Sequence, residues 1–252
     1  MSALLHIDNV KLIYHTKKSE TEALNNLSFK AKEGEFISIV GPSGCGKTTI
    51  LGLIAGILKP TEGAVFEHNT KIKGINTKAS LMFQKDNLLD WLTIYKNVML
   101  GPTLMHKNNK EAKAKVLGLL NKYGLGEFIK SYPKELSGGM RQRVALIRTL
   151  ATNPEILLLD EPFSALDYQT RIVVQNDVHA IIKSEHKTAI LVTHDISEAV
   201  AMSDKVIILS NRPAHVKKEV LLEFDKNLTP LDRRKTNMFN AYFNEIWENL
   251  EQ

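Results

Sequence analysis

The stretch Gly41-Pro42-Ser43-Gly44-Cys45-Gly46-Lys47-Thr48-Thr49 decides the fold. It fits the pattern of a glycine, four residues of any kind, then Gly-Lys-Ser/Thr. An apolar, β-branched run over 35–40 precedes it and predicts a buried strand. Apolar residues at helical spacing follow over 50–58 and predict a helix that ends near Pro60. The alternative is a glycine-rich turn with a chance lysine, and the flanking strand and helix argue against it.

This loop has the chemistry of a phosphate cradle. Glycines let the backbone bend tightly and turn successive N–H groups toward an anion. The helix that begins there presents its positive dipole end. Lys47 adds a charge for the outer phosphates, and the Thr48 hydroxyl is of the type that ligates Mg²⁺.

Composition sets wider limits. The chain has 252 residues, of which 43% are hydrophobic, and this is enough for one large domain or a domain with an appendage. Its net charge of +5 suits phosphates, nucleic acid or an anionic membrane surface, and decides among none of them. Cys45 is the single cysteine, so no internal disulfide forms and a reducing compartment is expected. The N-terminus lacks a signal pattern, and no apolar run approaches the roughly 20 residues that span a bilayer, so any membrane role is expected to be peripheral.

Polar residues close three of the predicted strands. Asp160 and Glu161 follow the aliphatic run 156–159, His194 follows the run 188–193, and Gln84 follows the run 81–83. In a parallel sheet these strand ends face one crevice. Asp160 is placed to hold Mg²⁺ through water, Glu161 to polarise a water molecule, and His194 to donate a hydrogen bond to a terminal phosphate. Taken singly, each is also an ordinary polar end of a strand.

A second helix N-terminus follows at Ser137-Gly138-Gly139, where Ser137 is a good cap and the glycines permit close approach of an anion. The alternative is a glycine-rich cap packed against a neighbouring element. Between the two halves of the sheet, residues 86–132 are rich in charge and predict an inserted helical subdomain. The lysines over 107–115 are interpreted as a solvated face, because they lack the interleaved aromatics of a nucleic-acid patch.

The remaining elements are less specific. Residues 4–32 predict antiparallel strands around a polar loop at 16–21, and short strands are expected again over 61–83 and 206–209. Tyr14 lies at the edge of the polar loop. Its ring could stack on a nucleotide base, although periodicity alone favours an ordinary strand-end tyrosine. The tail, 232–252, predicts a helix whose apolar stripe docks on the domain or on a partner rather than on lipid.

Together these motifs resemble the ATP-binding-cassette (ABC) family, the nucleotide-binding subunits of membrane transporters, and the likeness covers nearly the whole chain. The loop 41–48 resembles its Walker A motif and 156–160 its Walker B strand. The run 136–140 resembles the family signature, which separates these proteins from other P-loop ATPases. The remaining counterparts are Glu161 as catalytic carboxylate, Gln84 as Q-loop glutamine, 164–167 as D-loop, His194 as switch histidine, and Tyr14 as the aromatic that stacks on adenine.

A narrower resemblance is to the importer branch for nitrate, sulfonates, taurine and similar small solutes. It depends on the runs 88–93, 139–143, 163–167 and 210–213. The chain departs from that branch at Asp90, where proline is usual, and at Ala214-His215, where Gly-Arg is usual. These departures bear on the solute and leave the ATPase prediction intact.

The resemblance implies an α/β fold of the P-loop NTPase, ABC type: a RecA-like parallel sheet core with an antiparallel β subdomain and an inserted α-helical subdomain. It divides a single nucleotide-binding domain, 1–252, into an ATPase core with β subdomain (1–85 and 151–225), a helical subdomain with the signature (86–150) and a helical tail (226–252).

The family also implies cofactors and partners. ATP and Mg²⁺ bind to the loop 41–49, with Thr48, Gln84 and Asp160 as metal ligands. Two copies pair head to tail, so that Ser137, Gly138 and Gly139 of one meet the γ-phosphate held by the other. Permease subunits, and indirectly a solute-binding protein, complete an importer at the cytoplasmic face of the membrane. No nucleic acid partner is expected.

Two other functions stay open at this point. One is the ATPase subunit of an exporter. The other is a soluble ABC ATPase that acts on nucleic acid or ribosomes, although those proteins usually carry tandem cassettes or long coiled-coil insertions, which this chain lacks. A further hypothesis concerns Cys45 inside the cradle: its alkylation should block ATP binding, and ATP should protect it.

Overall fold

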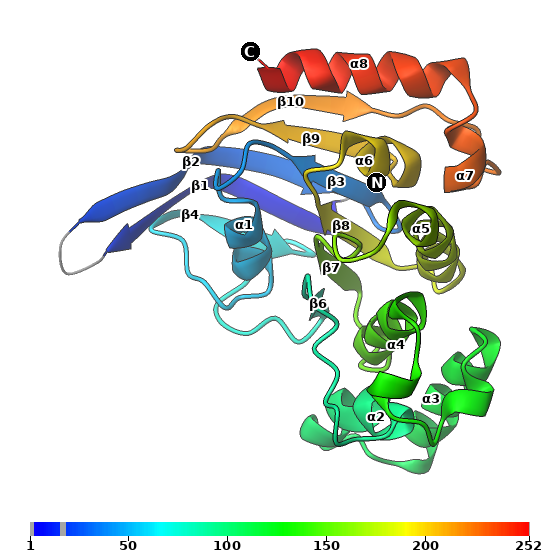
Figure 1. Cartoon of the computed structure of the whole chain (residues 1–252). Coiled ribbons are helices and arrows are strands. Elements are labelled where there is room, and N and C mark those ends of the chain that lie inside the picture. Colours follow the sequence, from blue (N-terminus) through cyan, green and yellow to red (C-terminus); the bar gives the residue numbers. More distant parts are fainter. Residues whose placement is uncertain (1–2, 16–18, 252) are drawn as a thin grey trace.

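A computed structural model describes residues 3–15 and 19–251, which form two sheets with helices around them (Figure 1). Of the polar loop predicted at 16–21, residues 16–18 lie outside the described residues. Within the described part of the chain, no helix combines the length and the apolar character needed to cross a bilayer.

The larger sheet has six strands, and five of them run parallel. Its order is β10 (Val216–Leu221), β9 (Lys205–Leu209), β3 (Phe36–Val40), β8 (Thr188–Val192), β7 (Ile156–Asp160) and β6 (Ala79–Met82), with only β10 antiparallel to its neighbour. In β7, Ile156 and Leu158 belong to the core on one face, while Leu157 and Leu159 belong to the core on the other. Both faces are buried, so the strand reads as an unbroken aliphatic run, as the sequence predicts.

The smaller sheet is antiparallel, with the order β2 (Glu20–Ala31), β1 (Leu5–His15), β4 (Glu62–Glu67) and β5 (Thr70–Lys71). The antiparallel pairing expected for residues 4–32 is therefore confirmed. Its apolar side chains, such as Ile7 and Leu27, share one core with α1 (Lys47–Ile54) and with one face of the parallel sheet.

The helix after the glycine loop is shorter than predicted, because it ends at Ile54 and not near Pro60. Gly56 takes a positive φ of 67°, and the N–H groups of Ile57 and Leu58 turn back to the carbonyl oxygen of Gly52 at 2.9 and 3.0 Å. This is a glycine-terminated helix end, which satisfies the carbonyl groups of the last turn. The apolar residues at 57 and 58 continue the helical spacing in sequence but lie in that turn.

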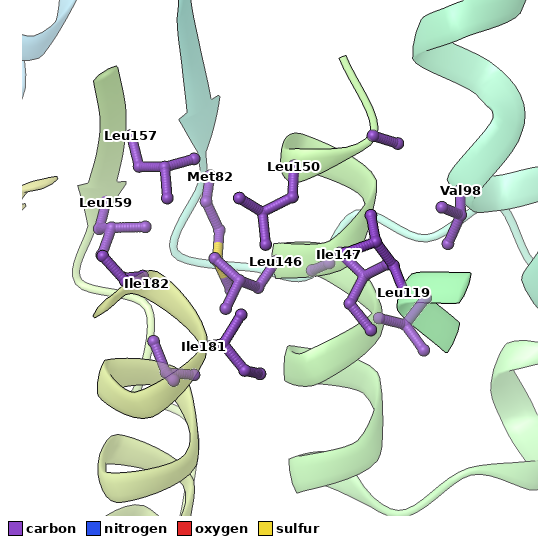
Figure 2. Packing of buried hydrophobic residues seen from close by; sticks show 14 of the residues in the cluster. Met82, Val98, Leu119, Leu146, Ile147, Leu150, Leu157, Leu159, Ile181 and Ile182 are labelled. Atoms are coloured by element: carbon purple, nitrogen blue, oxygen red, sulfur yellow. The ribbon is translucent and has the colours of Figure 1, made fainter. Parts of the chain in front are cut away.

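Two helices, α4 (Gly138–Leu150) and α5 (Tyr168–Ser184), pack against the other face of the parallel sheet. Beyond α4 lie α2 (Ile94–Leu104) and α3 (Lys110–Lys122), with short 3₁₀ turns at Gly126–Phe128 and Pro133–Glu135 (Figure 1). Figure 2 shows α4 between two layers: Leu146 and Leu150 face Leu157 and Met82 of the sheet, and Ile147 faces Leu119 of α3. One core therefore joins the sheet to the helical segment.

The C-terminal part closes the far edge of the sheet with α6 (Ile196–Met202), α7 (Pro230–Arg233) and α8 (Asn237–Glu251). Figure 1 shows α8 lying along β10 and β9. Its buried Phe239 and Ile246 pack with residues of α6, β9 and β10 in a separate core. The apolar stripe predicted in the tail thus docks on the domain itself.

Gly56 provides a test of this packing. A β-carbon there would lie 1.7 Å from the carbonyl oxygen of Gly74, in a backbone conformation that already disfavours side chains. We expect Gly56→Ala to lower the free energy of unfolding by about 3 kcal/mol or more in denaturant titration. Gly118→Ala is the matched control: it lies in the interior of α3 with nothing within 4 Å, and should stabilise by about 0.5–1 kcal/mol. Equal effects of the two variants would contradict this account.

Candidate active site

The carboxyl ends of three neighbouring strands meet at one edge of the parallel sheet. In the register, Ile39 of β3 pairs with Val192 of β8, which pairs with Asp160 of β7. The ladder continues past the strand ends, because Glu161 N donates to Val192 O at 2.9 Å and Thr193 N donates to Ile39 O at 3.2 Å. The residues that follow these strands therefore share one crevice, as expected for a parallel sheet.

The glycine loop lies at the end of β3 and leads into α1. Lys47 is only 7% exposed, and its Nζ donates to the carbonyl oxygens of Gly41 at 2.8 Å and Pro42 at 3.0 Å. Gly44 and Gly46 take φ values of 72° and 123°, which other residues rarely adopt. The loop thus folds around a buried ammonium group, and its sharp bends depend on glycine.

Thr48 and Asp160 form the candidate metal-binding pair. The Thr48 hydroxyl donates to Asp160 Oδ1 at 3.1 Å, which links the start of α1 to the end of β7. Burial raises the pKa of Asp160, and the nearby charge of Glu161 adds to the rise, while the bond from Thr48 and the charge of Lys47 oppose it. A hydroxyl and a carboxylate are hard oxygen donors that fit Mg²⁺. Within residues 3–15 and 19–251, no three His, Cys, Asp or Glu side chains gather as a metal site made by protein alone. The pair therefore suits an ion whose other ligands are water and phosphate.

Glu161 and His194 are in direct contact, with 3.0 Å between Oε2 and Nδ1. Glu161 has a positive φ of 45°, an uncommon conformation for a residue with a side chain. Ser164 continues the chain of contacts: its Oγ donates to Glu161 O at 3.0 Å and accepts from Gln84 Nε2 at 3.2 Å. Gln84, Glu161 and His194, which lie far apart in the sequence, are thereby brought together.

Tyr14 lies beside the end of the glycine loop. Its hydroxyl and that of Thr49 are 3.1 Å apart, and the residue is 39% exposed. A flat, partly exposed ring next to the loop is compatible with base stacking.

Ser137 caps α4 as predicted, accepting from Met140 N at 3.3 Å. The two glycines that follow have a packing role: a β-carbon at Gly138 would lie 3.2 Å from Leu166, and one at Gly139 would lie 2.8 Å from Val174. In the part of the chain that the structure describes, no hydrogen bond joins these residues to the glycine loop at 41–49. The two helix N-termini are therefore not joined by a hydrogen bond within the described part of one chain.

Three arginines support the site, and sequence reasoning assigned them no role. Arg148 donates to the carbonyl oxygens of Asn87 and Asp86 at 2.7 and 2.6 Å, and Arg141 Nε lies 3.0 Å from Asp86 Oδ2. These contacts attach the segment after Gln84 to α4. Arg212 donates to Gly44 O at 2.7 Å and braces the glycine loop. Arg141 and Arg148 are seven residues apart and lie on one face of α4, but nothing in the sequence indicates what that face contacts.

A buried lysine in a glycine loop between strand and helix, with a carboxylate on a nearby parallel strand, defines a P-loop nucleotide-binding protein. The ABC transporter family model matches residues 24–164. The chain belongs to the ABC transporter family and is its ATPase component, which energises transport. The expected P-loop fold of ABC type, with its parallel and antiparallel sheets, is thereby confirmed.

Several known proteins are similar to this chain over most of its length. It is 46% identical to the uncharacterized ABC transporter ATP-binding protein YtlC of Bacillus subtilis (98% of this chain, 96% of that protein). It is 38% identical to the taurine import ATP-binding protein TauB of Ruegeria pomeroyi (94% and 89%). Among solved structures, the ATP-binding cassette MJ0796, a dimer in a post-hydrolysis state bound to ADP and Pi, superposes with a TM-score of 0.73 at 34% identity (88% and 100%).

Cys45 is 2% exposed, and burial raises the pKa of its thiol against the opposing charges of Lys47 and Arg212. Burial and the raised pKa both slow the reaction of the thiol with a reagent in solution, because the reagent reaches Cys45 only when the loop opens. We expect the native protein to react with a disulfide reagent on the order of 100-fold more slowly than the unfolded chain. As the single cysteine, it gives an unambiguous signal, and Cys45→Ala supplies the background. Equal rates in native and unfolded protein would refute the buried position.

Proposed function

We propose that this chain is the ATP-hydrolysing subunit of a membrane importer for a small solute such as nitrate, a sulfonate or taurine. The observation that carries the proposal is the convergence of Thr48, Asp160, Glu161 and His194 at one edge of the sheet. The likeness to TauB supports the solute class. The motifs over 88–93 and 210–213 support the same branch.

The nucleotide is ATP bound with Mg²⁺. The loop residues Gly41, Pro42, Ser43, Gly44, Cys45, Gly46, Lys47, Thr48 and Thr49 hold the phosphates, and Tyr14 stacks on the base. Lys47 then exchanges its bonds to the loop carbonyls for bonds to phosphate oxygens. Thr48, Asp160 and Gln84 would hold Mg²⁺, directly or through water, and the ion would supply positive charge against the phosphates.

Glu161 orients and polarises the attacking water, and its contact with His194 sets the direction of its carboxylate. His194 is the more exposed of the two, with 64% of its side chain exposed against 23%, and it donates a hydrogen bond to the terminal phosphate. Gln84 reports the state of the site through Ser164 to the segment held by α4. Positioning and electrostatics thus account for the catalysis.

Two copies assemble head to tail, with Ser137, Gly138 and Gly139 of each copy completing the site of the other. Two observations support this arrangement. The capped start of α4 makes no hydrogen bond to the glycine loop of its own chain, as far as the described residues show, and the similar cassette MJ0796 is a dimer. A helix N-terminus that faces phosphate across the interface gives each anion two sets of backbone donors.

The membrane partners are permease subunits, with a solute-binding protein acting through them. A cavity of about 280 Å³ on α2 offers a docking surface, and its lining includes Leu92, Tyr95, Met99 and Leu100 beside polar and charged residues. Trp91, beside it in sequence, is 73% exposed. In this proposal the chain is peripheral, at the cytoplasmic face of the membrane, and its partners are permease subunits rather than nucleic acid. Co-purification of a permease and a solute-binding protein would separate an importer from an exporter.

The division of labour follows the chain. Residues 1–85 and 151–225 form the ATPase core with its β subdomain, 86–150 the helical subdomain with the signature, and 226–252 the tail. The helical subdomain meets the permease, and the core hydrolyses ATP.

Glu161→Gln tests the hydrolytic role directly. The amide keeps the shape of the side chain but is a poor base, so we expect ATP binding to persist while turnover falls by about two to four orders of magnitude. Nucleotide binding by equilibrium titration and phosphate release measure the two effects. Exposed Glu223→Gln is the control and should hydrolyse ATP normally. Near-normal turnover in Glu161→Gln would remove Glu161 from its role.

Mixed assemblies test the head-to-tail pairing. Lys47→Ala removes the phosphate lysine, and Ser137→Arg blocks the opposite surface, so each variant alone should be inactive. A dimer with one copy of each variant holds one doubly damaged site and one intact site. We therefore expect mixing to restore ATPase activity toward about half of the wild-type rate per mixed dimer. If each chain were a complete enzyme, mixing would restore nothing.

A further inference from the structure

A buried carboxyl group lies directly behind the exposed His194. Thr193 is 1% exposed and Glu198 is 4% exposed. The Thr193 hydroxyl donates to Glu198 Oε2 and accepts from Asp195 N at 3.0 Å. Thr193 continues the ladder of β8 and is buried, whereas the side chain of His194 is 64% exposed and faces the crevice. Both neighbours of His194 are thus held through one hydroxyl and one carboxyl.

The start of α6 is built around the same group. Asp195 caps the helix, because its Oδ1 accepts from Glu198 N at 3.1 Å. In a capping box, the acidic residue three positions on would reach back to the backbone N–H of the cap. Here the Thr193 hydroxyl stands between the two, bonded to that N–H on one side and to Glu198 on the other. The helix cap is thereby extended to the residue before His194.

The groups around Glu198 do not compensate for the cost of burying a charged carboxylate there. Glu198 Oε1 and Gln175 Nε2 are buried and have no hydrogen-bond partner among the described residues. The charged groups facing Glu198 are Arg171 of α5, Asp195 before α6 and Arg234 after α7. Arg171 bonds to Leu166 O at 3.0 Å, and Arg234 bonds to Gln175 Oε1 at 2.7 Å. An apolar residue would fill this helix position at lower cost, so the carboxyl group calls for a role beyond packing.

We infer that Glu198 is a positioning residue for His194, acting through the Thr193 hydroxyl to hold the histidine against Glu161. The inference rests on the catalytic role proposed for His194. Glu198 is buried behind the crevice and acts only through Thr193.

Because Glu198 is buried, the arrangement that positions His194 depends on pH. Desolvation raises the pKa of Glu198 to about 8, against the bond from Thr193 and the charges of the two arginines, while Asp195 adds to the rise. The arrangement that positions His194 therefore holds a proton which a displaced, solvated Glu198 would release. That arrangement is fully stable below the ordinary carboxyl range, and loses stability as the pH rises toward and through 8.

Glu198→Gln removes the titration and keeps the shape of the protonated side chain. With each profile normalised to its own value at pH 7, we expect the wild-type kcat to fall several-fold by pH 9 and the Glu198→Gln profile to fall less than two-fold. Glu67→Gln is the matched control: Glu67 is also a buried acid with a raised pKa, but it lies in the antiparallel sheet. The pH profile of kcat for Glu67→Gln should have the same shape as that of the wild-type protein. Parallel declines in all three proteins would overturn the inference.

Thr193 provides the second test. Thr193→Val removes the hydroxyl at nearly constant volume, so we expect kcat to fall about ten-fold while KM for ATP changes less than two-fold. Thr193→Ser keeps the hydroxyl and should recover most of the loss. Thr149→Val is the control for packing, because Thr149 is also buried but its hydroxyl donates only to the backbone carbonyl of Leu146. Equal activity of Thr193→Val and Thr193→Ser would contradict a positioning role for the Thr193 hydroxyl.

A direct reading of His194 separates this inference from the proposed catalytic role. The imidazole NMR signals, assigned with His194→Ala, should shift or broaden in Thr193→Val and return in Thr193→Ser. If His194→Ala hydrolyses ATP normally, the proposed role of His194 fails, while the signals still decide whether Thr193 and Glu198 position the ring. Unaltered signals in Thr193→Val would overturn the positioning role whatever the activity.

Discussion

The active site depends on the register of three parallel strands. Pairing of Ile39 with Val192, and of Val192 with Asp160, sets the ends of β3, β8 and β7 level with one another. Two further backbone bonds, from Glu161 N and Thr193 N, extend the ladder by one residue beyond the strands. A one-residue slip would exchange the side chains that fill the two cores. Because both cores are apolar, it is their close packing that opposes the slip. The core that excludes a slip is therefore also what places the lysine loop, the two carboxylates and the histidine in one crevice.

Much of this was predictable from the sequence, for a physical reason. Aliphatic runs of four or five residues mark strands that are covered on both faces, and the polar residue that ends each run marks the edge where function gathers. The glycine loop was recognisable because its bends demand positive φ at Gly44 and Gly46. The end of α1 was not predictable from periodicity, because Ile57 and Leu58 continue the helical spacing while Gly56 has already turned the chain. The helix ends there because the backbone of Gly74 lies against Gly56, and this tertiary contact is not visible in the sequence.

Side-chain networks behind the site were beyond the reach of pattern reasoning. Glu198 sits on a short helix where a surface acid would be ordinary, and only its 4% exposure and its contact with Thr193 distinguish it. Arg148 has the spacing of a surface helix residue, yet it donates to two backbone carbonyls of the loop after Gln84. In both cases the sequence shows a residue of common type at a common position. The role of each residue becomes visible only from the contacts that it makes in the folded protein.

Helix α4 connects these parts because it belongs to both layers. Its side chains fill the core between the sheet and the helical segment (Figure 2), and Arg141 and Arg148 hold the segment that follows Gln84. Its first turn carries Ser137 and the two glycines, packed against Leu166 and Val174. Close-packed cores resist continuous deformation, so a displacement at the start of α4 moves the helix as a body. The loop at 84–87 must then follow, because two carbonyl groups tie it to Arg148. Through Ser164, that loop is bonded to the backbone of Glu161. The turn at Ser137 and the backbone of Glu161 are thus linked by packing and hydrogen bonds, which is the connection that the proposed roles of these residues require.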